Sequence, residues 1–380
     1  MEIFGFFIWK LTNHLNKSFE QFGETIGTNQ NDKIFEDGTF HFGEFDVTNP
    51  NASTHPNEEC DIHFPSHISC TIEMMNLHRP VHTVVIDEIQ MIGDEERGWA
   101  WTRAILGAPA ENVHICGSPS ALTIVKKILN ECGEDVDVIE YERLSPLKMG
   151  NLIPSKSDWP LTLRAGDCVI AFSRQKIMEM KKDIERQWKE EIRCGVVYGK
   201  LPPLSRTHQA ELFNNPNNDV DVLIASDAVG MGLNLNIRRI IFTSTSKFDG
   251  SVMRPLTNDE IKQIAGRAGR YNSLYEEGSV TALDRRDYQR IRKALHSPHS
   301  EIQQIGIFPT FDHLALCHEV VGNAYDFGDL ITFFEEKIQL HPDYFVCNCD
   351  NMKYISDLLN DLELTFKDRF GIENVLMIFF

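Results

Sequence analysis

The sequence predicts an α/β protein that contains two parallel-sheet units followed by a helical region. Short apolar segments alternate with amphipathic segments of helical period from residue 81 to about residue 300. Strands that alternate with helices pair in parallel and form doubly wound sheets. A connector at about residues 145–160, with three prolines and little periodicity, interrupts the alternation and separates the two units.

The first unit is expected at residues 61–150, after a weakly structured segment at residues 1–60 that is rich in Asn, Thr, Gly and acidic residues. Within the unit, Thr83–Asp87 is predicted to be a buried strand that ends in acidic residues. The other strands of this unit are predicted at Val113–Cys116 and Val136–Ile139, and its helices at Gly98–Leu106 and Ser118–Leu129.

The second unit is expected at residues 151–300, where the alternation restarts after the connector. Thr257 is predicted to cap a helix that runs into an arginine-rich motif. After that the pattern becomes helical, and a partial helical region is expected at residues 301–380. The strands of the second unit are predicted at Cys168–Phe172, Gly195–Tyr198, Val220–Ala225 and Arg239–Thr243, and its other helices at Gln175–Trp188 and Leu204–Phe213.

The formal net charge of −19 argues at first against a nucleic-acid partner, because phosphates repel acidic surfaces. The charge is uneven, however: residues 1–160 carry a net −14, residues 161–300 a net +5 and residues 301–380 a net −10. A local basic cleft can hold a polyanion on an acidic protein. A mixed surface with chance clustering explains the same numbers, so charge alone does not decide the function.

The cysteine pattern and the apolar segments restrict the compartment. Nine cysteines without a disulfide-like spacing indicate a reducing environment. No apolar run reaches the roughly 18 residues that a membrane span needs, so no membrane association is expected. The apolar segment Met1–Leu11 has neither the basic region of a signal peptide nor the Arg- and Ser-rich composition of a mitochondrial import sequence, so neither leader is expected.

The segment Gln263–Arg270 places two arginines, each preceded by a glycine, three residues apart on one predicted helical face. Guanidinium groups held in this way suit the charge that develops on a transferring phosphoryl group. Gln263 is placed to read a nucleotide or to pair with a catalytic acid. Gly-Arg pairs also occur in ordinary helices and loops, so this arginine motif needs support from other segments.

Two further segments follow predicted strands, where ligands gather in α/β sheets. Asp87 and Glu88 close an apolar strand, and adjacent carboxylates there can hold Mg²⁺ and activate an attacking water. A solvated acidic loop is the alternative. The turn Ser226–Asn234 combines glycines, which permit close backbone approach, with side chains that hydrogen-bond a ribose or a phosphodiester. Cys116–Ser118 and Ala171–Arg174 also follow predicted strands, so polar or glycine-rich turns follow two strands in each unit. This arrangement predicts a cleft between two sheets.

The chain resembles superfamily 2 DExH-box RNA helicases, and in particular the helicases of the mitochondrial RNA degradosome in a plant-like version. The resemblance extends from about His67 to Arg369 and rests on four segments in order: Val85–Ile92, Arg97–Arg103, Gly230–Arg239 and Gln263–Arg270. It implies tandem RecA-like domains, of which the first is incomplete here. It also implies ATP hydrolysis with Mg²⁺, 3′-to-5′ translocation along RNA, an exoribonuclease partner and the mitochondrial matrix.

By position, the resemblance gives Asp87 and Glu88 the roles of holding Mg²⁺ and activating water. Gln90 resembles the residue that connects this acidic segment to the second unit, and Arg270 is expected to act as the arginine finger. The other residues expected around the nucleotide are Gly232, Asn234, Gln263 and Arg267. The residues expected to contact the RNA backbone are Thr71, Ser173 and Ser226.

A helicase of this type needs a phosphate-binding loop, G-x-x-x-x-G-K-[ST], before the acid pair, and this sequence contains none. Its one Gly-Lys pair, Gly199–Lys200, lies in the second unit and is followed by Leu201. Loss of a single preorganised donor typically costs about 10²–10³ in rate, and here a whole loop is missing. We therefore expect either an ATP-dependent RNA helicase or a catalytically impaired fragment that binds RNA or a partner. A fragment without function is a third reading.

Overall fold

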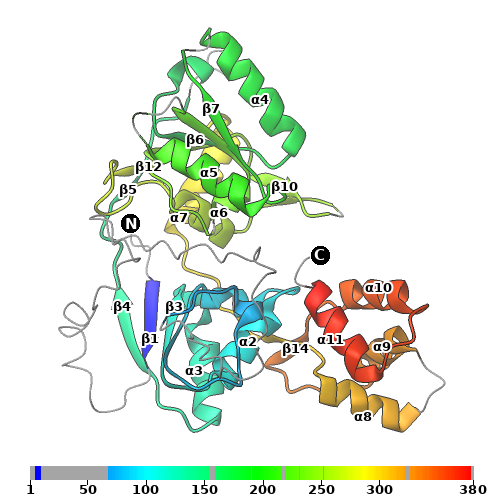
Figure 1. The fold of residues 1–380 in the computed structure, drawn as a ribbon. Helices are drawn as coiled ribbons and strands as arrows, with labels where there is room; N and C mark the ends of the chain where they lie inside the picture. The colour runs from blue at the N-terminus through cyan, green and yellow to red at the C-terminus, as the bar shows by residue number, and fades with distance from the viewer. Residues whose placement is uncertain are drawn as a thin grey trace, which may run out of the picture.

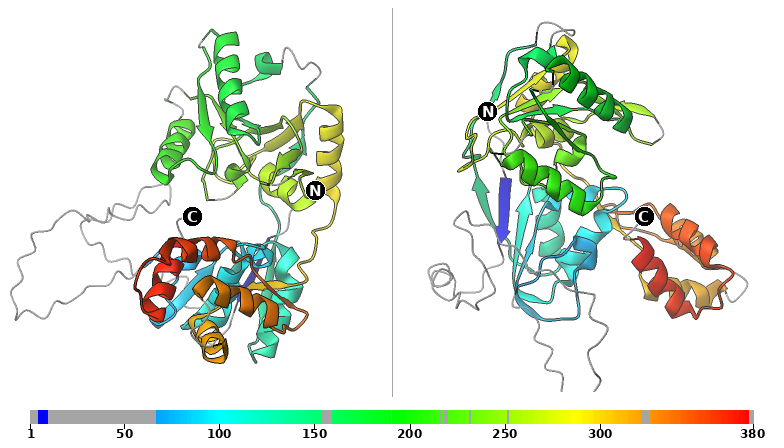
Figure 2. Two further views of the ribbon diagram at one scale, coloured as in Figure 1. Left: turned by 90° about the vertical axis from the view of Figure 1, so that its right-hand side faces the viewer. Right: turned by 45° about the horizontal axis from the view of Figure 1, so that its top comes forward.

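The structure is a computed structural model that describes residues 5–9, 67–153, 159–189, 191–215, 217, 220–230, 232–250, 252–321 and 326–377. It contains two α/β units, one above the other in Figure 1, with a group of helices beside the first unit (Figures 1 and 2). The predicted α/β class with a helical C-terminal region is therefore confirmed. Of the segment expected to be weakly structured, residues 1–60, all except residues 5–9 lie outside the described part of the chain.

The first unit is built on a four-stranded sheet. Its strands are β1 (Gly5–Trp9), β2 (Val81–Ile86), β3 (Ala110–Gly117) and β4 (Asp137–Tyr141), and its helices are η2 (Ile72–Met74), η3 (Ile89–Gly93), α2 (Gly98–Gly107), η4 (Pro119–Ala121) and α3 (Leu122–Glu131). The strand order is β2-β3-β1-β4. β2 and β3 are parallel, whereas β1 runs antiparallel between β3 and β4. The expectation of a purely parallel first sheet was therefore wrong at β1.

β2 is buried on one face only, so the prediction of a buried strand at this position was wrong in part. Ile86 is 1% exposed and packs, with the partly buried Val84, against residues of α2 and α3. Thr83 is exposed and Val85 is 64% exposed, because successive side chains of a strand point to opposite faces. An apolar run alone does not distinguish a strand covered on one face from a strand covered on both.

The second unit is a six-stranded, fully parallel sheet with the order β5-β12-β9-β6-β8-β7. Its strands are β5 (Leu147–Met149), β6 (Asp167–Ile170), β7 (Cys194–Val197), β8 (Val222–Ala225), β9 (Arg239–Phe242) and β12 (Gly278–Ala282), beside a hairpin of β10 (Ser246–Phe248) and β11 (Met253–Pro255). Its helices are η5 (Trp159–Thr162), α4 (Arg174–Gln187), α5 (Pro203–Asn214), η6 (Asp227–Gly230), α6 (Asn258–Ala265) and α7 (Arg285–His296).

Four of these strands coincide with the predicted ones, and two were not expected. β12 was not predicted. β5 lies in the expected connector and pairs with β12, so the second sheet includes residues before residue 151. The doubly wound arrangement is confirmed in this unit. Cys168 and Ile170 of β6 pack toward α5, α6 and α7, whereas Val169 packs toward α4 on the other face. Such strands are apolar throughout because both faces are covered.

The C-terminal region packs on the first unit although it follows the second unit in sequence (Figures 1 and 2). Its helices are α8 (Phe311–Val321), α9 (Phe327–Lys337), α10 (Asp350–Leu359) and α11 (Phe366–Met377), and it contains an unexpected parallel pair of strands, β13 (Ile305–Ile307) and β14 (Tyr344–Val346). The ring of Trp99 on α2 lies 5.3 Å from the ring of Phe308. Of the helices in the described ranges, none has the length and apolar character needed to cross a membrane.

A reciprocal capping box starts α6, as the sequence predicts for Thr257. The Thr257 hydroxyl accepts a hydrogen bond from the Glu260 amide at 3.1 Å, and the Glu260 carboxylate accepts one from the Thr257 amide at 2.7 Å. The same carboxylate pairs with Arg254 at 2.9 Å and with Lys247 at 2.8 Å. Glu260 therefore fixes the start of the helix that leads into the arginine motif.

A buried carboxylate supports β6, an interior strand of the second sheet. Asp167 is 0% exposed and pairs with Arg238 at 2.6 Å and with Arg239. We expect Asp167→Ala to lower the free energy of unfolding by about 3 kcal/mol, because both guanidinium groups lose their buried acceptor. The matched control Asp183→Ala removes an exposed pair with Arg186 and should cost less than about 1 kcal/mol. Urea denaturation measures both, and equal costs would contradict the assignment.

Glu260 should make stability depend on pH in the acidic range. Burial on its own would raise the pKa of Glu260, but hydrogen bonds from Arg254, Lys247 and the Thr257 amide outweigh it and lower the pKa to about 2. The folded pKa lies below the unfolded value, so this stabilisation is complete above about pH 4.3 and is lost as the pH falls toward 2. We expect Glu260→Gln to lose less stability than wild type between pH 6.0 and pH 3.5 in urea titrations. An identical loss in both proteins would show that another group dominates.

Candidate functional site

A cleft of about 750 Å³ lies between the two units and takes its walls from both. Its first wall comes from the chain just after β2 and β3, and its second wall from α6 and the arginine motif. The predicted cleft between two sheets is therefore present. Six of the residues that were expected at the nucleotide line the cleft, namely Asp87, Glu88, Gln90, Gln263, Arg267 and Arg270.

The acid pair follows β2 in a strained turn. Glu88 has φ 55°, in the left-handed region that residues other than glycine rarely adopt. Two hydrogen bonds hold this turn: the Glu88 amide donates to the Asp87 carboxylate at 2.8 Å, and the buried Trp101 indole donates to the Asp87 carbonyl at 2.8 Å. Backbone strain that the surrounding structure enforces is common at functional sites. The turn directs both carboxylates to the cleft.

Gln90 connects two strand ends of the first unit. Its amide nitrogen donates to the Glu88 carboxylate, and its amide oxygen accepts from the Ser118 backbone amide at 2.9 Å. The resemblance implied a connection from Gln90 to the second unit instead. Ser118 follows β3, the parallel neighbour of β2, so the described contacts of Gln90 keep the acidic segment in register with that strand.

The arginine motif bends away from the helix, so the expectation that both arginines share one helical face was wrong. α6 ends at Ala265, and Gly269 has φ +70°. A Cβ atom at Gly269 would lie 2.2 Å from the backbone nitrogen of Gly278, so only glycine fits there. The close approach of the motif to the start of β12 is a tertiary contact that helical spacing cannot predict.

The two arginines are each tied to the turn after β8. Arg267 donates from Nε to the Gly230 carbonyl at 2.9 Å, and one of its terminal nitrogens lies 3.5 Å from the Glu88 carboxylate of the first unit. Arg270 donates to the side-chain oxygen of Asn234. The acid pair of one unit thus faces the arginines of the other across the cleft.

Gln263 has an unsatisfied donor at the same place. Its Nε2 atom is buried and makes no hydrogen bond in the described part of the chain. A buried amide donor without a partner costs free energy unless a ligand or water satisfies it. Gln263 therefore indicates that the cleft accepts a polar group.

The other predicted residues lie outside this cleft. Gly232 and Asn234, expected at a ribose, are not among the described residues that line it, and Asn234 is connected to it by a hydrogen bond from Arg270. Ser226 and Ser173 follow the adjacent strands β8 and β6, and their hydroxyls accept hydrogen bonds from the local amides of Ala228 and Lys176. Thr71 is exposed before η2 and its hydroxyl makes no capping hydrogen bond.

Sequence reasoning missed several cleft residues. Arg143, just after β4, lines the cleft and donates to backbone carbonyls of the arginine motif. His299 Nδ1 lies 2.9 Å from Asp259 of α6 and 3.3 Å from the hydroxyl of Ser118, and so joins the two units. The contact of Arg143 with Gly266 and the contact of Ser118 with His299 each join residues more than 100 positions apart. No local sequence pattern could therefore have identified them.

Cys116 and Asp259 are two of the cleft residues whose pKa values are shifted. Burial and the nearby carboxylates of Asp87 and Glu88 raise the pKa of Cys116 to about 11, so its thiol stays protonated at neutral pH. Burial on its own would raise the pKa of Asp259, but hydrogen bonds from His299 and the Ser300 amide lower it overall. Asp259 is thus held as a carboxylate.

The residues present fit a nucleotide with a divalent cation. Carboxylate oxygens such as those of Asp87 are the ligands that Mg²⁺ prefers, and Mg²⁺ usually takes its remaining ligands from phosphates and water. No group of three or more potential metal ligands occurs among the described residues. Arg267 and Arg270 supply the positive charge that phosphates require.

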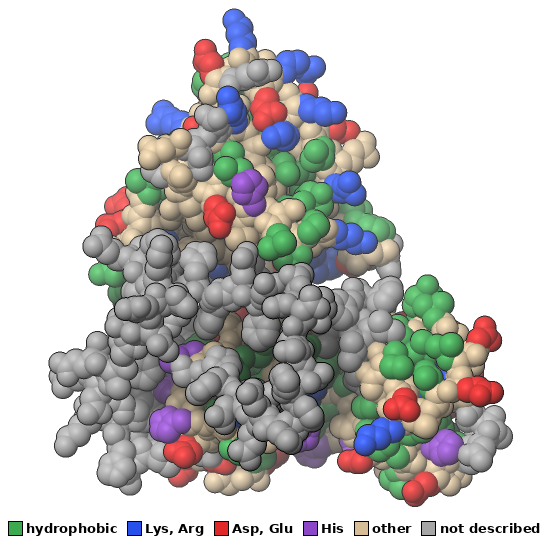
Figure 3. All heavy atoms as spheres, viewed as in Figure 1, with side chains coloured by type: hydrophobic (Ala, Val, Ile, Leu, Met, Phe, Trp, Pro, Cys, Tyr) green, Lys and Arg blue, Asp and Glu red, His purple; other side chains and the backbone are tan. Residues whose placement is uncertain are grey.

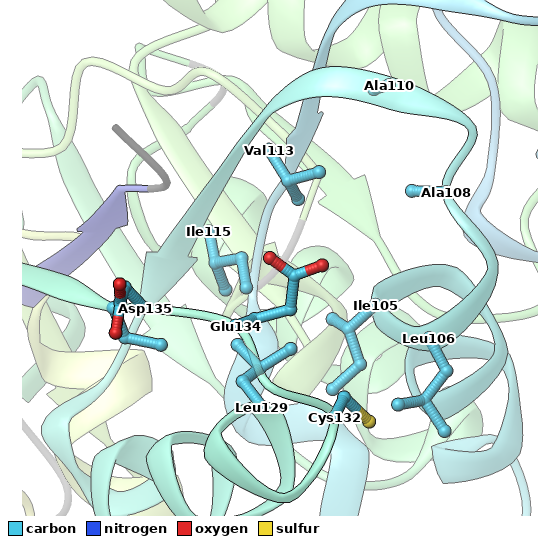
Figure 4. Close-up of a pocket in the computed structure, with 11 residues that line it drawn as sticks. Ile105, Leu106, Ala108, Ala110, Val113, Ile115, Leu129, Cys132, Glu134 and Asp135 are labelled. Atoms are coloured by element: carbon cyan, nitrogen blue, oxygen red, sulfur yellow. The ribbon is translucent and has the colours of Figure 1, made fainter. Parts of the chain in front are cut away.

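A second, smaller cavity of about 110 Å³ lies in the first unit between α2, β3 and α3. Figure 4 shows the Glu134 side chain turned toward apolar side chains that include Ile105 and Ile115. None of the predicted site residues lines this cavity. The cleft between the units is therefore the candidate site.

Comparisons with known proteins agree with this geometry. Residues 51–141 match the family model described as the DEXQ-box helicase domain of Suv3, and residues 155–272 match the helicase conserved C-terminal domain. The first match ends with β4, the last strand of the first sheet, and the second match begins after β5. The acid pair lies in the first match and the arginine motif in the second.

Three relatives are representative. The chain is 42% identical to the mitochondrial ATP-dependent RNA helicase SUV3L of rice over 82% of its own length and 42% of the relative, and 42% identical to the mitochondrial DExH-box ATP-dependent RNA helicase DExH18 of Arabidopsis thaliana over 81% and 39%. It is 40% identical to the human mitochondrial ATP-dependent RNA helicase SUPV3L1 over 80% and 38%. The chain thus spans less than half the length of each of these relatives. The two matches and these identities show that the chain contains a Suv3-type DEXQ-box helicase domain followed by a helicase conserved C-terminal domain.

Proposed function

We propose that this chain is the two-domain motor of an ATP-dependent RNA helicase of the mitochondrial RNA degradation and surveillance type. One observation carries the proposal: Glu88 of the first unit and Arg267 of the second lie 3.5 Å apart in a cleft that Asp87 and Arg270 also line. When catalytic groups are divided between two units in this way, nucleotide binding can change the relative position of the units. Translocation from 3′ to 5′ belongs to the same proposal.

Each cleft residue has a role in this proposal that its chemistry supports. Asp87 would hold Mg²⁺, which neutralises phosphate charge when it is bound, and Glu88 would orient and deprotonate the attacking water. Gln90 holds the Glu88 carboxylate in place. Arg267 would bind phosphate, and Arg270, anchored by Asn234, would stabilise charge on the transferred phosphoryl group.

RNA would cross the edge of the sheets at which the chain leaves each strand. Ser173 and Ser226 follow adjacent parallel strands of the second unit, and both hydroxyls can still donate hydrogen bonds to phosphates. The exposed Thr71 would supply the corresponding contact from the first unit. Lys and Arg side chains are numerous on the visible face of the upper unit in Figure 3, which agrees with the net positive charge of residues 161–300.

The relatives also suggest a setting. SUV3L of rice, DExH18 of Arabidopsis and human SUPV3L1 are all named mitochondrial. By this likeness the chain would act in the mitochondrial matrix, with an exoribonuclease that degrades the RNA strand as it is released. Tests of these two points are localisation in cells and co-purification with a 3′-to-5′ exoribonuclease.

The missing phosphate-binding loop favours a second candidate, an RNA- or partner-binding unit with impaired ATP turnover. Such a loop follows the carboxyl end of a strand and opens a helix. In the first sheet, β1 lies between β3 and β4 and runs antiparallel to both. The carboxyl end of β1 therefore lies at the opposite edge of the sheet from the cleft. Without the loop, the amides that cradle the phosphates are absent from this sequence.

An ATPase assay separates the two candidates. We expect this chain to hydrolyse ATP at least about 10²–10³-fold more slowly than a relative that contains the loop, because several preorganised donors are missing. RNA-stimulated turnover is measured for wild type, Arg270→Ala and the relative. Fast, RNA-stimulated turnover that Arg270→Ala abolishes would refute the impaired unit and leave the motor. Turnover that Arg270→Ala does not change would contradict the role given to Arg270.

RNA binding tests the part of the proposal that needs no nucleotide. We expect single-stranded RNA to bind without ATP, with an affinity that falls steeply as salt rises. Thr71→Val removes a hydroxyl without a capping role and should weaken binding about 2- to 10-fold, the value of one hydrogen bond. The control Thr83→Val changes another exposed threonine of the first unit, on β2, and should leave the affinity unchanged. Fluorescence anisotropy measures both, and equal effects would remove Thr71 from the RNA path.

A further inference from the structure

A third arginine holds the arginine motif, and it comes from the chain between the two sheets. Arg143 follows β4, the last strand of the first sheet, by two residues and precedes β5, the first strand of the second sheet. Its half-buried guanidinium group lines the cleft. It donates to the carbonyls of Gly266 at 2.9 Å and Gly269 at 2.7 Å, and also to that of Ala268.

These acceptors surround the two functional arginines. Gly266 and Ala268 flank Arg267, and Gly269 immediately precedes Arg270. The carbonyls that follow a helix end lack helical partners, and a cation there is favourable. A planar guanidinium can satisfy several of them at once in a fixed geometry, which a lysine cannot.

Arg143 is itself fixed from the side of the connector. Its Nε atom donates to the carbonyl of Ser145 at 2.6 Å, two residues before β5. The second unit holds the motif independently, because the Gly269 amide donates to Ile237 at 2.7 Å and the Arg270 amide donates to Tyr275 at 3.0 Å. Arg143 therefore joins a backbone that the second unit holds to a connector that leads into the first unit.

We propose that Arg143 is a positioning residue that couples the connector between the two units to the backbone of the arginine motif, so that a change in the angle between the units moves Arg267 and Arg270. The inference rests on the proposed function, because it assigns a purpose to the position of these arginines. Burial lowers the pKa of Arg143, but a guanidinium stays protonated at neutral pH, so the coupling is present whenever the chain is folded.

Hydrogen exchange tests the coupling without a nucleotide. The amides of Arg267, Ala268, Gly269 and Arg270 all donate to described carbonyls, so we expect them to be protected from exchange in wild type. We expect Arg143→Ala to speed exchange of these amides about 10-fold or more, because loss of about 1.4 kcal/mol of local stabilisation is one factor of ten. Arg143→Lys should give an intermediate rate, because an ammonium group reaches fewer carbonyls.

A matched control comes from the C-terminal region. Arg369 likewise donates to carbonyls at the end of a helix, that of Leu359 in α10 at 3.0 Å and that of Leu362 beyond it. Arg369→Ala should speed exchange near the end of α10 and leave the motif protected. If Arg143→Ala speeds exchange throughout the chain, or leaves the motif amides at the wild-type rate, the positioning role is wrong. Arg143→Lys keeps the question answerable if Arg143→Ala does not fold.

A double-mutant cycle connects the position of the motif to the nucleotide. The affinity for a fluorescent ATP analogue with Mg²⁺ is measured for Arg143→Ala, Arg267→Ala and the double variant. If Arg143 acts through Arg267, the double variant should bind no more than about twofold more weakly than Arg267→Ala alone, because only independent sites add. Fully additive losses would overturn the coupling. If wild type binds no analogue, the proposed function fails at this step, while the exchange result still decides the role of Arg143.

Discussion

Parallel strand pairing determines where chemistry can occur in this chain. In the second unit all six strands run in one direction, and in the first unit β2 and β3 do the same, so the turns that leave these strands gather at one edge of each sheet. The two edges face each other across a cleft of about 750 Å³. The acid pair and the arginine motif depend on this arrangement, because neither segment alone could bring a carboxylate within 3.5 Å of a guanidinium from the other unit.

The arginine motif is held by its backbone rather than by helical structure. α6 begins with a strong capping box and ends at Ala265, before the two arginines. Beyond that point Gly269 packs against Gly278, the motif amides bond to Ile237 and Tyr275, and Arg143 binds the carbonyls. A side chain at either glycine would force this backbone apart. Gly269 of the motif is therefore required for packing, whereas Arg267 and Arg270 provide the functional groups of the motif.

The first unit differs most from what a complete helicase domain requires. Its sheet contains one antiparallel strand where a strand, phosphate-binding loop and helix would be expected. Asp87, Glu88 and Gln90 nevertheless keep a constrained geometry, with a left-handed residue and hydrogen bonds to Trp101 and Ser118. The groups proposed to act on a bound nucleotide are therefore present, while the amides that would hold its phosphates are missing from the sequence. Binding and turnover are for this reason separate questions in this protein.

By itself the sequence determined the α/β class, four strands of the second sheet, the cap of α6 and the two segments that form the cleft, because periodicity, capping and strand-end chemistry are local signals. Only the tertiary structure decided that β1 is antiparallel, that Leu147–Met149 joins the second sheet, that the arginines lie beyond the helix and that Arg143 holds them. These features depend on partners far away in the chain, in several cases more than 100 residues. Residue spacing carries no information about such contacts, because they exist only after the two sheets have formed and packed.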